Sequence, residues 1–309
     1  MNRLGRSAPG GGALWVVLSG LGLLAGCSSR APVVPSTPDA RQPLIDQLLQ
    51  FDETLVSAAE TAQARAVFED HVDRLASCAT ENCALDSLLG RDGFATDRAM
   101  AAPLANTASY ALAEGRGSCA ALVAVVLAVA SERHLALEAV VFRDHVVLAS
   151  ATDPAVHYEV LDGGRVLEPQ ELAVYEPPPG GPVRVDAERY LPYYLDNLAA
   201  RLAEAGRDDE ADRFFIDALA LAPDASRLNY NYGTFLLGRE RDREALAYLD
   251  RAIELGWADA DAWVNRGVAL WHLDRGEEAR TSFENALDLD PTDRDARLNL
   301  RKIAEAAHP

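Results

Sequence analysis

Positive charge is scarce in this 309-residue chain. Lysine and arginine together number 29 against 48 aspartates and glutamates, so the formal net charge is −19 at pH 7. Proteins that bind nucleic acid turn a basic patch or stripe toward the phosphates, and no such cluster offsets the acidic residues here. The composition therefore excludes nucleic acid as a partner of this protein.

Long apolar runs are equally rare. Residues 13–24, ALWVVLSGLGLL, form one apolar stretch of 12 residues behind the positive charges of Arg3 and Arg6. This length is too short to span a bilayer and is typical of a signal peptide. No later stretch is long and isolated enough for a membrane span. The hydrophobic content of 49% is nevertheless ample for the cores of more than one domain.

The apolar stretch ends in LLAGC at residues 23–27. Small residues directly before a cysteine, in register behind such a stretch, resemble a bacterial lipobox; an ordinary signal peptide that contains a cysteine is the alternative. The resemblance implies that residues 1–26 are a lipoprotein signal peptide and that Cys27 is acylated. Because each buried CH₂ contributes about 0.8 kcal/mol, several acyl chains attach a protein stably to a membrane. Ser28, in place of aspartate, implies a lipoprotein of the bacterial cell envelope, in the outer membrane and facing the periplasm.

Proline-rich segments divide the rest of the chain. Residues 27–43 contain four prolines and few large apolar side chains, which predicts an extended tether. The sequence EPPPGGP at residues 176–182 predicts a linker over residues 176–190, with a surface loop inside one domain as the alternative. These segments leave two folded units, one at residues 44–175 and one at residues 191–309.

Cysteine is sparse, with four in the chain. Cys78 and Cys83 lie five residues apart in SCATENCAL, a spacing that predicts a short loop closed by a disulfide in an oxidising compartment. A metal site is the alternative, but this segment contains no histidine and no further cysteine pair exists. We expect no bound metal and no cofactor. Because Cys27 is assigned to lipid, Cys119 remains as an unpaired thiol.

The C-terminal third repeats itself with a period of 34 residues. This period separates Gly233 from Gly267 and Ala245 from Ala279. The last copy has the pattern Trp263, Gly267, Ala279, Phe283, Ala286 and Pro291. The pattern resembles the tetratricopeptide repeat, in which small residues let paired helices approach and aromatic side chains fill the space between them. The period predicts an all-α solenoid of three repeats, near residues 192–225, 226–259 and 260–293, with a polar capping helix to about residue 307.

The resemblance to tetratricopeptide repeats implies a protein-binding array whose first helices line a concave groove. By repeat register, the groove residues are Tyr193, Asp196, Arg227, Tyr230, Asp261, Trp271 and His272. Residues 196–293 contain 22 acidic and 11 basic side chains, a formal net charge of −11. We therefore expect a protein or peptide partner with basic and apolar character, bound in a salt-sensitive manner. The sequence leaves the oligomeric state open.

Residues 44–175 change from a helical pattern to a strand pattern. Apolar residues recur at spacings of three and four up to about residue 89, and the run AALVAVVLAVASERH after Cys119 is long enough for a buried helix. LEAVVF, HVVLAS and VHYEVL, at residues 137–142, 145–150 and 156–161, predict three short strands joined by turns. The prediction is an α+β domain with a helical N-terminal part, a central helix that begins at Cys119, and a small antiparallel sheet.

The order of cysteine, histidine and acid along these elements resembles the bacterial transglutaminase-like superfamily, in particular its members with a C-terminal tetratricopeptide array. The matching residues are Phe94, Asn106, Gly117, Ser118, Cys119 and His145. Residues 142–144 depart from the pattern, because Pro-Gly is common there in the family. The resemblance implies a papain-like triad of Cys119, His145 and an acid. Glu159 within the third strand is the preferred acid, and Asp162 at the following turn is the alternative.

Two readings of Cys119 have different chemical consequences. As a small buried hydrophobe it needs no reactivity. At a helix N-terminus beside an imidazolium, a thiol pKa falls from about 8.5 into the range of roughly 3.5 to 7.5, and the thiolate is a nucleophile. The first function is then a thiol-dependent amide hydrolase or acyl transferase, with His145 as the general base. The alternative is a non-catalytic scaffold in which an inert transglutaminase-like domain accompanies the repeats.

Overall fold

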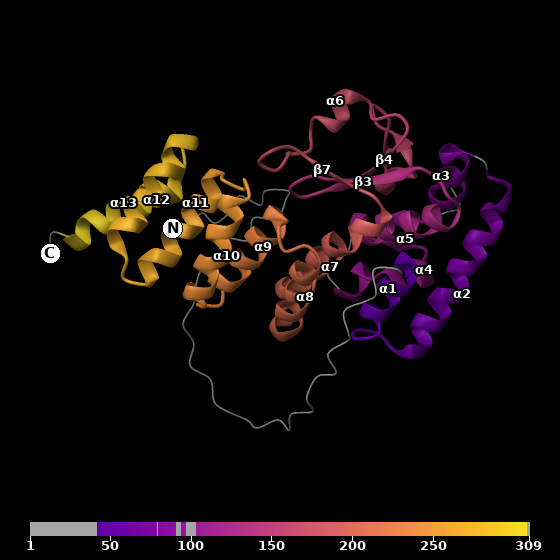
Figure 1. Ribbon diagram of the computed structural model, residues 1–309, viewed down its shortest axis with the longest axis horizontal. Helices are drawn as coiled ribbons and strands as arrows, with labels where there is room; N and C mark the ends of the chain where they lie inside the picture. The colour runs from indigo at the N-terminus through magenta and orange to yellow at the C-terminus, as the bar shows by residue number, and fades with distance from the viewer. Residues whose placement is uncertain (1–41, 79, 91–93, 97–102, 308–309) are drawn as a thin grey trace, which may run out of the picture.

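The computed structural model describes residues 42–78, 80–90, 94–96 and 103–307. Cys27, the predicted signal peptide and most of the predicted tether lie outside the described residues. In the part of the chain that is described, no helix combines the length and the apolar character that crossing a membrane requires. Figure 1 shows a group of helices beneath a sheet, with a row of paired helices extending from them toward the C-terminus.

The N-terminal helices surround one apolar helix. Their bounds are α1 Leu44–Asp52, α2 Ala58–Arg74, η1 Leu75–Ser77, α3 Glu81–Leu89, η2 Pro103–Asn106, α4 Ala108–Glu114 and α5 Cys119–Glu132. Every side chain of α5 from Ala120 to Ala130 is buried, so this helix is enclosed on all sides, unlike an amphipathic surface helix. The surrounding α2 is more polar and begins with a capping box between Ser57 and Glu60. The predicted buried helix after residue 118 is therefore the centre of the fold.

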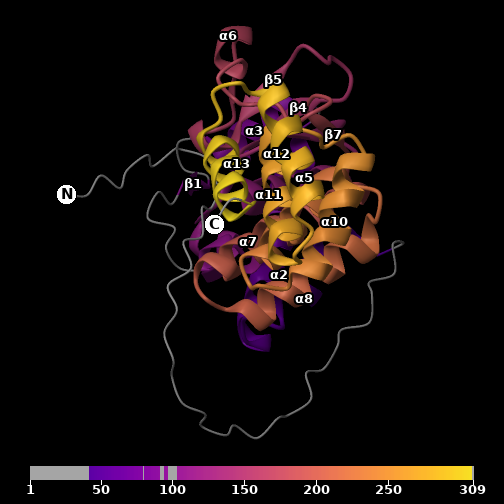
Figure 2. The same ribbon diagram turned by 90° about the vertical axis from the view of Figure 1, so that its left-hand side faces the viewer.

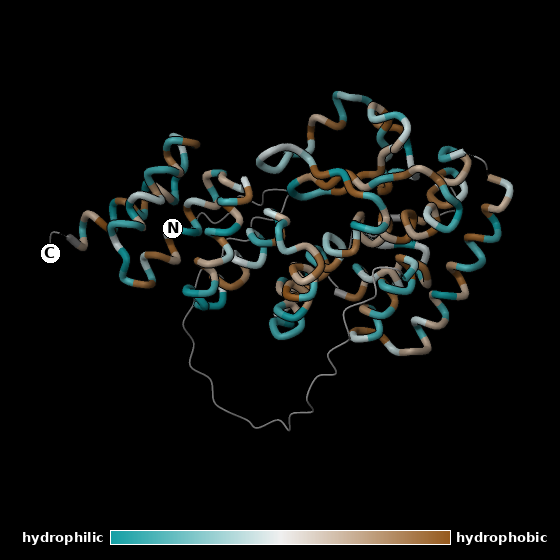
Figure 3. The backbone as a smooth tube through the Cα atoms, in the orientation of Figure 1, coloured by the Kyte–Doolittle hydropathy of each residue, from teal (hydrophilic) through white to brown (hydrophobic). Residues whose placement is uncertain are grey.

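The sheet lies over this central helix. Its strands are β3 Leu137–Val141, β4 Val146–Ser150, β5 His157–Glu159, β6 Arg165–Val166 and β7 Val183–Val185, all antiparallel, in the order β6-β5-β4-β3-β7. Val141 and Leu148 belong to the core around α5, whereas Val140 and Val147 pack on the opposite face against Leu167. The central strands β3 and β4 are buried on both faces, which agrees with the brown, hydrophobic colour of much of the sheet in Figure 3, whereas β6 is exposed. A separate parallel pair joins β1 Ala95–Thr96 to β2 Arg116–Gly117.

The linker predicted over residues 176–190 is wrong for its second half. Residues 183–185 form β7, which pairs with β3 so that Val183 lies opposite Val141. The side chain of Arg184 in β7 also donates a hydrogen bond of 2.9 Å to Glu138 in β3. The sequence VRV is too short to be recognised as a strand by its own periodicity. These three residues form a strand because they pair with β3 at the edge of the sheet. They complete the sheet before the helical array begins.

Paired helices form the array. They are α7 Ala187–Glu204 with α8 Asp208–Leu221, α9 Ser226–Leu237 with α10 Asp242–Glu254, α11 Ala260–His272 with α12 Gly276–Leu289, and the final α13 Arg294–Ala307. Each repeat predicted from the 34-residue period holds one pair. A methyl group added at Gly267 would lie 2.6 Å from the ring of Phe283, which explains why a glycine stands where α11 crosses α12. Figure 2 shows the successive pairs from the C-terminal end of the array.

The array and the sheet-bearing part share one hydrophobic core. Tyr190 and Tyr194 of α7 are completely buried and belong to the same cluster as the apolar residues of α5. The hydroxyl of Tyr190 donates to the carbonyl of Ala120 at 3.1 Å, and that of Tyr194 donates to Asp52 at 2.6 Å. The first repeat is therefore packed directly on the helix that carries Cys119. This contact fixes how the array is placed relative to the sheet.

Candidate active site

Cys119 is the first residue of α5. Ser118 directly before it is the N-cap, and its hydroxyl accepts a hydrogen bond of 3.1 Å from the N–H of Ala121. The preceding helix ends at Gly115, whose φ of +66° lets the chain turn sharply toward α5. The thiol is half-buried and is the free cysteine among the described residues. The helix N-terminus places its positive dipole end at this sulfur.

His145 stands at the turn between β3 and β4, next to the thiol. Its imidazole forms a hydrogen bond with Cys119, and the backbone N–H of Val146 donates a second one to the sulfur. On the other side of the ring, Nε2 donates to Glu159 Oε2 at 2.9 Å. Because Nε2 is engaged there, we assign the contact with the thiol to Nδ1, the other ring nitrogen. The three side chains form a continuous chain of hydrogen bonds from sulfur to carboxylate.

Glu159 is the acid that contacts this histidine. It ends β5 and is buried, and its second oxygen accepts a hydrogen bond of 2.9 Å from the N–H of Leu161 at the start of η3 Val160–Asp162. Asp162 instead pairs with Arg165 at 2.7 Å and keeps 66% of its side chain exposed. The structure thus brings Cys119, His145 and Glu159 together and leaves Asp162, the alternative acid, at an exposed turn.

The charges of the triad depend on one another. Burial by itself raises the pKa of Cys119, but the hydrogen bond and charge of His145 outweigh it, so the thiol pKa lies below its ordinary value. Burial lowers the pKa of His145, but its bonds to Cys119 and Glu159 raise that pKa to about 10. Burial likewise raises the pKa of Glu159, and the contacts with His145 and Tyr175 reverse the effect and lower it. His145 is therefore an imidazolium at neutral pH, and Cys119 and Glu159 ionise at lower pH than the free side chains do.

Tyr175 is a site residue that the sequence did not reveal. Its ring stacks on that of His145, with centroids 4.4 Å apart, and its hydroxyl donates to Glu159 Oε2 at 2.5 Å. It follows the short helix α6 Pro169–Leu172 in a segment without a recognisable motif. Burial and the neighbouring Glu159 raise the pKa of Tyr175, so its hydroxyl keeps its proton as a donor. The residues after 161 show no alternation of apolar and polar side chains that would have pointed to this contact.

The arrangement contains a nucleophile, a proton carrier and an orienting acid. Cys119 can attack an electrophilic carbon, His145 can donate or accept the proton, and Glu159 holds the ring in place. The free N–H groups at the start of α5 face the negative charge that develops on a carbonyl oxygen during such an attack. Among the described residues no cluster of histidine, cysteine and carboxylate side chains is suited to hold a metal ion.

The two remaining described cysteines are bonded to each other. Cys78 follows η1, Cys83 lies in the first turn of α3, and the structure joins them in a disulfide with their Cα atoms 5.4 Å apart. Thr80 caps α3 inside this loop by accepting from the N–H of Cys83 at 3.3 Å. The pair therefore closes the loop between two helices and leaves no thiol there for a metal.

The residues predicted for the concave groove fall into two groups. Asp196 is buried and paired with Arg227 at 3.2 Å, and the half-buried ring of Tyr230 stacks on Trp257 at 5.2 Å. Tyr193 is also half-buried. Arg227 also donates to backbone carbonyls of residues 142–143, which lie outside the array. Contacts within the chain thus occupy Asp196, Arg227 and Tyr230, and their assignment to partner binding stays a prediction. The prediction from repeat register could not include segments outside the array.

The second group lies on the third repeat and is exposed. Asp261 keeps 67% of its side chain accessible, and Trp271 is among the exposed large hydrophobic residues. His272 is exposed as well, and its Nδ1 lies 2.7 Å from Asp242 at the start of α10. Asp261 also lies 3.8 Å from Arg143, and the assignment of these three residues to partner binding stays a prediction.

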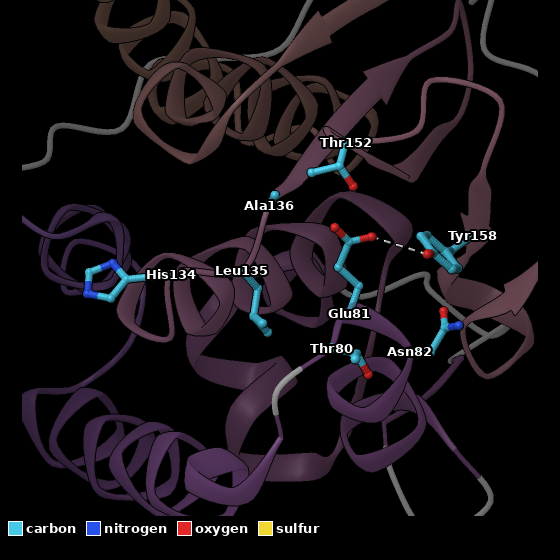
Figure 4. A pocket seen from close by; sticks show the side chains of 8 residues that line it. All are labelled: Thr80, Glu81, Asn82, His134, Leu135, Ala136, Thr152 and Tyr158. Atoms are coloured by element: carbon cyan, nitrogen blue, oxygen red, sulfur yellow. Dashed lines mark hydrogen bonds between the residues drawn. The ribbon is translucent and has the colours of Figure 1, made fainter.

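A polar hollow lies elsewhere on the molecule. Its volume is about 400 Å³, and its lining residues are Thr80, Glu81, Asn82, His134, Leu135, Ala136, Thr152 and Tyr158 (Figure 4). His134 lies two residues after the end of α5, whose 14 residues span about 21 Å, so the hollow is at the opposite end of this helix from Cys119. Inside it, Tyr158 donates to Glu81 at 3.3 Å. No member of the triad lines this hollow.

The array is similar to known repeat proteins. Family profiles described as tetratricopeptide repeat match residues 193–222 and 260–293. The chain is 38% identical over 107 residues to the UDP-N-acetylglucosamine--peptide N-acetylglucosaminyltransferase of Giardia intestinalis, a match that covers 35% of this chain and 7% of that protein. It is 33% identical over 103 residues to the Hsp70-Hsp90 organizing protein of Triticum aestivum, covering 33% of this chain and 18% of that one. Both matches take in less than a fifth of the relative.

A similar helical arrangement occurs in a solved structure. The first tetratricopeptide domain of the human RPAP3 protein superposes with a TM-score of 0.37 at 24% identity, over 38% of this chain and 94% of that one. The two profile matches lie in the first and third helix pairs of the array, in register with the 34-residue period. The C-terminal array of this protein therefore contains tetratricopeptide repeats.

Proposed function

We propose that this protein is a thiol-dependent enzyme that acts on amide bonds, as a hydrolase or an acyl transferase, and that its tetratricopeptide array binds a protein partner. The observation that carries this proposal is the chain of hydrogen bonds from Cys119 through His145 to Glu159. It matches the roles implied by the resemblance of residues 44–175 to the transglutaminase-like superfamily. It also supplies each group that acyl transfer needs.

The reaction has two steps. Cys119 Sγ attacks the carbonyl carbon of the amide, the C–N bond breaks, and His145 gives its proton to the leaving amine, which leaves a thioester on the enzyme. Water or a second amine then attacks the thioester, His145 accepts the proton of this nucleophile, and the thiolate is released. Water gives hydrolysis and an amine gives transfer. Glu159 keeps the imidazole ring oriented in both steps.

The array supports a role in bringing a partner to this site. Its formal charge is −11 over residues 196–293, and the accessible Asp261, Trp271 and His272 combine negative charge with aromatic surface. A basic and apolar segment of a protein complements that surface. The wheat relative is named as an organizing protein of two chaperones, which fits a scaffold role for repeats of this kind. The alternative, a scaffold whose thiol is inert, shares this part of the proposal.

We also propose that the protein is a lipoprotein of the bacterial envelope, acylated at Cys27. The LLAGC sequence supports this, and a disulfide between Cys78 and Cys83 suits an oxidising compartment outside the cytoplasm. Mass spectrometry of the N-terminus of membrane-derived protein tests it. A diacylglyceryl-modified peptide that begins at Cys27 is expected, and an unmodified peptide that runs across residues 26–27 contradicts it.

The reactivity of Cys119 tests the enzyme proposal without a known substrate. Intact protein is treated with iodoacetamide at pH 7, and the modification of Cys119 is followed by mass spectrometry beside glutathione as a free thiol. We expect Cys119 to react faster than glutathione, and the His145→Ala variant to lose this advantage. A Cys119 that reacts no faster than glutathione leaves the scaffold as the function.

A further inference from the structure

The turn between β3 and β4 reaches into the groove of the array. Residues 142–144 connect the last residue of β3 to His145, and the guanidinium of Arg227 in α9 donates to the carbonyls of Phe142 and Arg143 at 2.5 and 2.8 Å. Arg227 is itself held by the buried Asp196 of α7. The first two repeats thus bind the backbone of this turn.

The side chain of Arg143 fills a pocket formed by the second and third repeats. It forms an ion pair with Asp259 at the start of α11 and lies 3.8 Å from Asp261. Its guanidinium lies over the ring of Trp257, 5.3 Å from the centroid. Glu176, on the segment before β7, completes the set at 3.1 Å. The three carboxylates complement the charge of the guanidinium, and the flat indole ring complements its planar shape.

This contact differs from an ordinary surface ion pair. Only 21% of the Arg143 side chain and 18% of the Asp259 side chain are exposed, and Trp257 beneath them is 1% exposed. Charge-assisted hydrogen bonds in such a setting are stronger than those in water, where an exposed pair contributes little. The pocket therefore fixes the turn in one position.

Arg143 is two residues from His145, so a fixed turn restricts the histidine. Two residues of extended chain span at most about 7 Å. The turn is closed by the N–H of Phe142, which donates to the carbonyl of His145 at 2.8 Å. The Phe142 ring also packs on Tyr175 at 5.4 Å, and Tyr175 stacks on His145. If the turn leaves the pocket, the hydrogen bond between Phe142 and His145 and the ring contacts of Tyr175 are disturbed as well.

We propose that Arg143 is a positioning residue, through which the second and third tetratricopeptide repeats hold His145 in register with Cys119. This inference rests on the function proposed above, because it concerns the same triad. Its consequence is that the array is part of the catalytic unit as well as a binding scaffold. This also gives a reason why residues 142–144 lack the Pro-Gly that is common in the family. Neither proline nor glycine has a side chain long enough to reach the array, whereas Arg143 does.

The test is the pH dependence of Cys119 alkylation in the Arg143→Ala variant of the full chain. The groups that face the thiol and its imidazole are His145, Glu159, Tyr175, Tyr190 and Arg201, and the substitution leaves all of them in place. We expect the midpoint of the alkylation profile to move up by about one pH unit, and the rate below that midpoint to fall about tenfold. The circular dichroism spectrum should be unchanged.

Asp259→Asn provides a second variant that preserves folding of the array. Asp259 Oδ1 caps α11 by accepting from the N–H of Ala262 at 2.8 Å, and asparagine caps equally well. The substitution removes the negative charge that faces Arg143. We expect it to shift the profile in the same direction, and the double variant Arg143→Ala with Asp259→Asn to add nothing further. Additive shifts overturn the inference.

Arg239→Ala is the matched control. Arg239 also pairs with a carboxylate, Asp208, and lies over an aromatic ring, that of Phe235 at 5.0 Å. Its substitution should lower the melting temperature without moving the alkylation profile. A wild-type profile with the midpoint of a free thiol contradicts the proposed function itself. A depressed wild-type midpoint that Arg143→Ala leaves unchanged overturns only the positioning role.

Discussion

The ring of Tyr175 lies on the imidazole of His145, with the centroids 4.4 Å apart and the planes inclined by 28°. Its hydroxyl and His145 Nε2 share one oxygen of Glu159, at 2.5 and 2.9 Å. A single side chain therefore restrains both the proton carrier and the acid that orients it. The stack covers the imidazole, and the hydroxyl occupies a lone pair of the carboxylate that is withdrawn from water.

Separating the two contacts of Tyr175 gives the first prediction. Tyr175→Phe keeps the stack and removes the hydrogen bond to Glu159, so we expect the rate of Cys119 alkylation at pH 7 to fall about threefold to tenfold. Tyr175→Ala removes both contacts and should cost more. Stopped-flow alkylation of the two variants measures the difference. Equal rates for Tyr175→Phe and wild type show that the hydroxyl has no part in orienting the triad.

The ionisation of the triad gives the second prediction. The pKa of Cys119 is lowered and the pKa of His145 is raised to about 10. The thiolate–imidazolium pair therefore forms as pH rises through the pKa of the thiol. It is lost as pH rises through the pKa of the imidazole. The alkylation rate should therefore reach its plateau at a lower pH than that of a free thiol and keep it to about pH 10. His145→Ala should restore a single rise near the ordinary thiol pKa of about 8.5. A wild-type rise near that value contradicts the assigned charges.

Local patterns predicted the parts of the site that lie on regular elements. Ser118 caps the helix after it, the strand at residues 145–150 begins beside His145, and Glu159 ends the strand predicted at residues 156–161. The preference for Glu159 over Asp162 came from its place within the predicted strand and from the resemblance to the transglutaminase-like superfamily, whose acid it matches better.

Contacts between distant segments could not be predicted in the same way. Arg143 and Asp259 are 116 residues apart, and neither belongs to a motif that names the other. Repeat register assigned Arg227 to the groove, but it carries no information on the turn at residues 142–144, whose carbonyls accept hydrogen bonds from Arg227. The strand β7 is missed for a related reason, since its three residues are held by β3 rather than by their own pattern.

A buried carboxyl gives the third prediction. Asp52 is completely buried where it accepts from the hydroxyl of Tyr194 and from the N–H of Ser109, at 2.6 and 2.7 Å. Burial outweighs these bonds and raises the pKa of Asp52 from 3.8 to about 6. The native state therefore binds more protons than the unfolded state between these values. The contribution of Asp52 to stability is fully present below pH 3.8 and is lost as pH rises through 6.

The size of this effect is about 3 kcal/mol, from two pKa units at 1.36 kcal/mol each. Because many acids titrate in the same range, the measurement is the difference in unfolding free energy between wild type and Asp52→Asn. That difference should fall by most of this amount from pH 4 to pH 7. Urea denaturation at both values checks it. A difference that stays constant shows that Asp52 titrates alike in both states.

Helix crossing in the third repeat gives the fourth prediction. A methyl group at Gly267 lies within 2.9 Å of three atoms of the Phe283 ring, which is buried and cannot move away. Gly267→Ala should therefore destabilise the protein by about 1–3 kcal/mol. Gly276→Ala is the control, since its nearest neighbour is an atom of Trp271 at 3.7 Å, an ordinary contact. Thermal unfolding should show a loss for the first variant and little change for the second.

The accessible surface of the third repeat gives the last prediction. Trp271 is 37% exposed and Asp261 lies on the same helix, whereas the groove residues nearer the triad are already occupied by the turn at residues 142–144. A partner segment should therefore bind at this end of the array. Suitable probes are fluorescent peptides rich in arginine and leucine, compared with peptides in which glutamate replaces arginine.

Fluorescence anisotropy should show binding of the basic peptides alone, and the affinity should weaken with salt because exposed charges are screened. Trp271→Ala should weaken binding about tenfold, since a large aromatic ring at the centre of an interface carries much of its energy. Leu289→Ala is the matched control, because Leu289 is 55% exposed but ends α12, the second helix of the pair. If the two substitutions weaken binding equally, the peptide is held by general apolar attraction and not by the groove of the first helices.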